Sequence, residues 1–172
     1  MIMSNEEHSQ RKLAEDFGVA KDLHTLCSQS AESLLFLGER TDDPQLSQLL
    51  TGTARARHEI AGQLLRVLPK DEAAQCSEKV GEIASRYRLI PGNTEVTDEL
   101  LLEIAKIDQL ALQELRRSFK TIVNLSLACS LSSLLATFQI SSDKLSSSLR
   151  GTSMRREDNR SKDQTDIKED KK

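Results

Sequence analysis

The apolar residues of this 172-residue chain recur every three or four positions along four stretches, which is the spacing of a single buried helix face. These stretches predict helices over about 19–40, about 44–68, about 97–120 and about 121–143. A weaker pattern over about 72–88 predicts a short extra helical segment between the second and third helices. The pattern therefore predicts a mostly helical chain.

Prolines and small polar residues mark the ends of these helices. Pro44, Pro69 and Pro91 each stand between two helical stretches, and none lies inside one. Asp43 is the predicted N-cap of the second helix, with Pro44 at its first position. Thr97 is the predicted cap of the third helix. One helix of roughly 45 residues would be long for a compact domain, so we expect a break near Lys120.

Short connections make consecutive helices antiparallel neighbours. The sequence therefore predicts an all-α fold, an antiparallel four-helix bundle over residues 19–145 with the short extra helical connection. Residues 1–18 are expected to form an N-terminal arm. Residues 146–172 hold eight Lys or Arg and six Asp or Glu, with almost nothing apolar, and are predicted to be a disordered charged tail.

Composition excludes several functions. Aromatic residues make up 3% of the chain, which argues against a site that stacks sugars or bases. The net charge of −3 offers no positive field for nucleic acid, so such contacts are expected only from the tail residues between Arg150 and Lys162. Cys27, Cys76 and Cys129 are too widely spaced for a disulfide framework or a zinc site.

The sequence also bears on location. Residues 122–140 are the most apolar stretch, but polar residues interrupt them throughout, so we interpret them as a buried helix and not as a membrane span. The first residues lack the apolar core of a signal peptide. We therefore expect a cytoplasmic protein that does not contact a membrane.

The middle of the predicted bundle is polar. The helical register places Ser30, Arg57 and Asp108 at or beside buried positions. We expect Arg57 to pair with Asp108, or to extend to Glu32 or solvent, and to fix the register of the bundle. On this interpretation Arg57→Ala should destabilise the fold less than Leu64→Ala.

A carboxylate metal site is the alternative for this centre. Bundles that bind two metals use a Glu from each of two helices and Glu-x-x-His from each of the other two, and this chain has no Glu-x-x-His. The remaining candidate ligands are Glu32, His58 and Glu59, with Asp108. No glycine-rich phosphate loop or nucleophile motif occurs, so we expect no cofactor, no small-molecule substrate and no enzyme activity.

The segment 22–68, with Asp43-Pro44-Gln45-Leu46, Arg57 and Leu64, resembles the first hairpin of an uncharacterised bacterial ferritin-like family, a domain of unknown function. Gly81-Glu82-Ile83-Ala84 and the segment 98–115 agree in outline, so the resemblance covers about 20–145. The family tends to carry an acid, a glycine and an aromatic residue within its first and third helices, and here only Asp108 keeps that character. The resemblance implies a cytoplasmic ferritin-like bundle, and a fold alone does not supply a function.

Two functions are expected on these grounds. The first is a non-enzymatic accessory or protein-interaction protein, a stress-related role included, whose partner is another protein or a second copy. It is motivated by Leu125, Ala128 and Leu135, which lie off the predicted buried line of the fourth helix. The same residues are also consistent with a fourth helix that is simply the most buried one. The second function is a degenerate carboxylate metal-binding ferritin-like protein.

Overall fold

The computed structural model describes residues 5–70, 76–90 and 96–166, and the side chains of residues 6–70, 76–90 and 96–148. These residues form helices and no strand: α1 (Asn5–Arg40), α2 (Pro44–Val67), α3 (Glu78–Leu89), α4 (Asp98–Phe119) and α5 (Leu125–Asp166). The predicted all-α class is confirmed.

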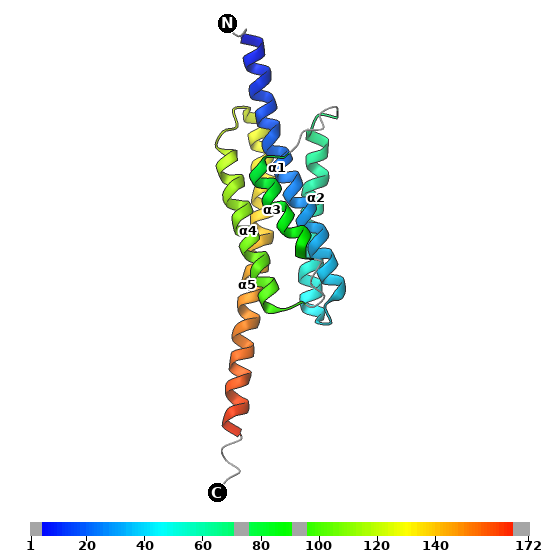
Figure 1. Cartoon of the computed structure of the whole chain (residues 1–172), viewed down its shortest axis with the longest axis vertical. Helices are drawn as coiled ribbons and strands as arrows, with labels where there is room; N and C mark the ends of the chain where they lie inside the picture. Colours follow the sequence, from blue (N-terminus) through cyan, green and yellow to red (C-terminus); the bar gives the residue numbers. More distant parts are fainter. Residues whose placement is uncertain (1–4, 71–75, 91–95, 167–172) are drawn as a thin grey trace.

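The five helices lie along the long axis of the molecule and alternate in direction (Figure 1). Helix α1 packs on α2 and α3, α4 packs on α3 and α5, and α5 packs on α2. Because Val80, Ala84 and Tyr87 of α3 are buried, this helix contributes to the core, although the sequence predicts only a short connection there. Helix α1 also contacts α4 and α5, so the described body is a bundle of five helices in which α1 touches each of the other four.

The helix ends follow the predicted capping residues. The Asp43 carboxylate accepts hydrogen bonds from the backbone N–H groups of Gln45 and Leu46, at 2.9 and 3.1 Å, and Pro44 begins α2. The Thr97 hydroxyl accepts from the Leu100 N–H at the start of α4. Helix α4 ends at Phe119 and α5 begins at Leu125, so the predicted break near Lys120 is confirmed.

Helix α1 begins at Asn5, earlier than the predicted start near residue 19. No proline or glycine stands before Gly18 to end a helix there, and Asp16 is already buried. The Asp16 carboxylate accepts hydrogen bonds from the N–H groups of Val123 (3.1 Å) and Asn124 (2.8 Å), so α1 caps the start of α5. Residues 5–18 are therefore helical and continuous with the rest of α1. The division of the chain at residue 18 stays a prediction.

Helix α5 also runs further than the predicted end near residue 143. Its backbone is helical to Asp166, because no proline and only Gly151 oppose a helix after Leu125. The disorder predicted for residues 146–172 in solution stays a prediction, and residues 167–172 lie outside the described residues. The first turns of α1 and the last turns of α5 extend beyond the body at opposite ends (Figure 1).

Among the described helices, one is long and apolar enough to cross a membrane by length and composition alone. It is the Leu125–Ser148 part of α5, and about a third of it is buried inside the molecule. Helix α5, which corresponds to the helix predicted over about 121–143, is therefore buried along one side only.

The contact between α1 and α5 is testable through Asp16. Asp16→Ala leaves two backbone N–H groups at the start of α5 without their acceptor, so we expect a loss of about 1–3 kcal/mol in the free energy of unfolding. The matched control is Glu15→Ala, which removes only an exposed pair with Arg11 and should change stability by less than about 0.5 kcal/mol. Urea unfolding measures both values, and equal losses would contradict the capping role.

Candidate functional site

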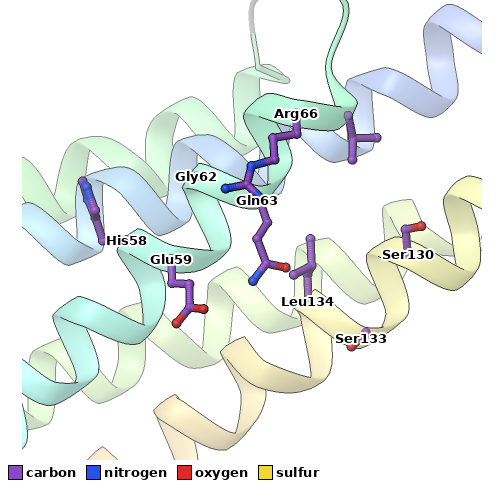
Figure 2. A pocket seen from close by; sticks show the side chains of 9 residues that line it. His58, Glu59, Gly62, Gln63, Arg66, Ser130, Ser133 and Leu134 are labelled. Carbon is purple, nitrogen blue, oxygen red and sulfur yellow. The ribbon is translucent and has the colours of Figure 1, made fainter.

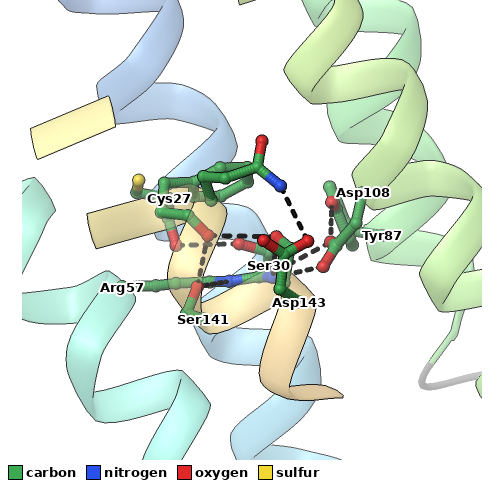
Figure 3. Close-up of polar contacts among 10 residues, drawn as sticks. Cys27, Ser30, Arg57, Tyr87, Asp108, Ser141 and Asp143 are labelled. Atoms are coloured by element: carbon green, nitrogen blue, oxygen red, sulfur yellow. Dashed lines mark hydrogen bonds and ion pairs between the residues drawn. The ribbon is translucent and has the colours of Figure 1, made fainter. Parts of the chain in front are cut away.

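The largest fully buried side chain in the described part of the molecule is a charged one, Arg57 of α2. Its guanidinium faces the carboxylate of Asp108 on α4, which is 1% exposed (Figure 3). Arg57 Nη1 donates to Asp108 Oδ1 at 2.9 Å, and Nη2 donates to Oδ2. This two-pronged geometry matches the guanidinium fork to both carboxylate oxygens, which makes it the strong form of an ion pair.

Side chains from two further helices, α3 and α5, complete this network. The Tyr87 hydroxyl of α3 donates to Asp108 Oδ1 at 2.5 Å. On α5, Ser142 Oγ accepts from Arg57 Nη2 at 3.1 Å and Ser141 Oγ accepts from Arg57 Nε at 3.4 Å. We call the five side chains of Arg57, Tyr87, Asp108, Ser141 and Ser142 the polar centre. Among the described side chains, every buried nitrogen and oxygen has a hydrogen-bond partner.

The serines are oriented by their own helix. Ser141 Oγ donates to the Phe138 carbonyl at 2.7 Å, and Ser142 Oγ donates to the same carbonyl at 3.1 Å. Since each hydroxyl proton is used in this way, the oxygen lone pairs are left to accept from Arg57. The Phe138 ring lies 4.6 Å from the guanidinium carbon and adds a cation–π contact.

The local pattern explains why these side chains meet. Arg57 stands in the buried stripe of α2 between Ala54 and Ile60, and Asp108 stands between Ile107 and Ala111 on α4. The serines stand in the buried stripe of α5 between Phe138 and Leu145. Each helix therefore places polar groups at one level of an otherwise apolar face, and packing brings these levels together.

Burial and charge act on the pKa values of the network. Burial alone would lower the pKa of Arg57, but the negative charge of Asp108 outweighs it and raises the pKa, so the guanidinium stays protonated. Burial, and then the charge of Asp108, raise the pKa of Tyr87 well above its ordinary value of 10.0. Burial raises the pKa of the nearby Cys27 thiol to about 12. The network therefore holds one ion pair and neutral neighbours.

The other predicted site residues do not join it. Ser30 is buried, but its hydroxyl donates to the Cys27 carbonyl of its own helix at 3.2 Å. Glu32 is exposed on α1, and His58 and Glu59 are exposed on α2. Arg57 therefore pairs with Asp108 and does not extend to Glu32 or to solvent.

The residues of the centre do not fit a metal. Both Asp108 oxygens are engaged by Arg57, one of them also by Tyr87, and a guanidinium cation fills the space between the helices. His58 and Glu59 extend to different sides of α2 (Figure 2). Within the described ranges, no group of three or more His, Cys, Asp or Glu is arranged to hold a metal ion.

Sequence reasoning missed Tyr87, Ser141 and Ser142. Tyr87 is the single tyrosine of the chain, and the helical spacing that makes it a core residue also carries its hydroxyl inward. The serine pair follows Phe138 by three and four residues, the spacing that keeps it on the buried face. Helical spacing therefore places these three hydroxyl groups on buried faces, but it does not specify which residues of other helices they contact.

A groove of about 690 Å³ runs between α2 and α5. Glu59 and Gln63 point from α2 toward α5, and Ser130, Ser133 and Leu134 form the opposite wall (Figure 2). A smaller groove of about 440 Å³ continues along the same two helices beside Ile140 and Asp143. Both grooves border the exposed side of α5.

The exposed side of α5 is free of charge over a long distance. Residues 121–142 contain no Asp, Glu, Lys or Arg. Leu125 is 81% exposed and Ile140 is 55% exposed, and smaller exposed residues lie between them. We define the outer face of α5 by six residues at helical spacing: Leu125, Cys129, Ser132, Ser133, Ala136 and Ile140.

No protein-family model, curated protein or solved structure matches this chain. The polar centre and the outer face of α5 are therefore the features from which a function can be inferred.

The ion pair makes the expected cost of Arg57→Ala comparable to that of Leu64→Ala, whereas the sequence alone predicts a smaller cost for Arg57→Ala. Arg57→Ala leaves a buried carboxylate without its partner, so we expect a loss of about 3–5 kcal/mol. Leu64→Ala leaves an ordinary cavity in the core and should lower the free energy of unfolding by about 2–5 kcal/mol. The combination Arg57→Met, Asp108→Leu and Tyr87→Phe removes every charge and the tyrosine hydroxyl together and should recover most of the loss. Urea midpoints test this, and a triple variant as unstable as Arg57→Ala would contradict it.

Tyr87 predicts how stability changes at alkaline pH. The unfolded chain loses the tyrosine proton near pH 10, whereas burial and the negative charge of Asp108 raise the pKa of Tyr87 in the folded chain, although the positive charge of Arg57 acts against them. Its contribution to stability is therefore complete below pH 10 and is lost as the pH rises above that value. Because the chain has one tyrosine, ultraviolet tyrosinate absorbance reports this group alone. Tyrosinate absorbance should appear at the same pH at which the helical circular dichroism is lost. Tyrosinate absorbance in a protein that is still fully helical would contradict the prediction.

Proposed function

We propose that this protein is a non-enzymatic accessory protein that binds another polypeptide through the outer face of α5. The observation that carries the proposal is the uncharged, exposed length of that helix. The chain as a whole is 30% charged, so 22 residues of average composition would hold about seven charges, and residues 121–142 hold none. A surface helix that faces only water is normally polar and charged on that side.

The other helices show the ordinary pattern. The exposed sides of α1 and α4 carry charged residues, among them Glu32, Glu39, Glu103 and Lys106. Helix α5 differs because its exposed side carries no charged residue between Leu125 and Ile140. A long exposed surface that combines apolar and small uncharged residues and holds no charge is consistent with a site that another molecule covers.

The polar centre supports a structural role for the buried charges. Arg57 and Asp108 are 0% and 1% exposed, and their hydrogen-bonding groups are used within the core. They offer no open position at which a substrate would react. By bonding to Ser141 and Ser142, Arg57 also sets which side of α5 faces inward. The buried network thereby supports the orientation of the outer face.

A polypeptide fits this face better than a lipid surface. Helices that lie on membranes carry Lys or Arg on their polar side and large apolar or aromatic residues on the other. The outer face of α5 has Cys129, Ser132, Ser133 and Ala136 at its centre. Small residues allow close approach of another helix backbone. The cytoplasmic location and the ferritin-like ancestry remain predictions, and no feature of the described residues favours the metal-binding alternative.

The test is site-specific photo-cross-linking in producing cells. A photoreactive amino acid is placed at position 132, on the outer face, and in a control protein at position 32, which is exposed on α1. We expect one discrete adduct from position 132 and none from position 32. Adding Ala136→Glu should abolish the adduct while circular dichroism stays unchanged. A position-132 protein that yields no adduct would contradict the proposal.

A further inference from the structure

We draw no further inference here: the strongest candidate, the groove of about 690 Å³ between α2 and α5 that Glu59, Gln63 and Ser133 border, carries nothing because these side chains are exposed and nothing in the structure shows what covers them.

Discussion

The ion pair between Arg57 and Asp108 is the interaction on which the arrangement of the helices depends. Two charges removed from water cost several kcal/mol each unless they are paired and hydrogen-bonded, so the core must keep α2 and α4 at the one register that joins them. Tyr87 brings α3 to the same level and Ser141 and Ser142 bring α5. Helix α1 joins through Ser33, whose hydroxyl donates to the Tyr87 carbonyl at 2.6 Å. A slip of any of these helices would leave a buried polar group without a partner.

This constraint links the core to the surface. Arg57 bonds to two adjacent serines on the buried side of α5, and these bonds support the rotation of the helix that also buries Leu131 and Phe138. Asp16 fixes the start of the same helix from α1. The outward side of this helix holds no charged residue over positions 121–142, unlike the exposed sides of α1 and α4. The buried pair of Arg57 and Asp108 thus supports the orientation of α5, whose outer face is uncharged. The proposed binding role rests on this uncharged face.

The metal-site hypothesis shows how far residue types alone can mislead. Candidate carboxylate and histidine ligands occur on α1, α2 and α4. Helical register does not tell, however, whether a buried carboxylate binds a metal or pairs with a guanidinium. Here Asp108 meets Arg57, and His58 and Glu59 lie on the exposed side of α2. The part that α3 plays in the core was underestimated for a related reason. The segment around Val80, Ala84 and Tyr87 has a weak pattern because it is short, and only its neighbours show that a complete face of it is buried.

Local chemistry determined the helical class, the starts of α2 and α4 and the break after Phe119, because capping residues, prolines and apolar spacing act within one turn of the chain. The sequence by itself also placed Arg57 and Asp108 inside. Only the tertiary structure decided that α3 joins the core, that α1 begins early enough to cap α5, and that Tyr87 and two serines complete the polar centre. These outcomes depend on contacts between residues 21 to 108 positions apart, and periodicity within one helix contains no information about its neighbour.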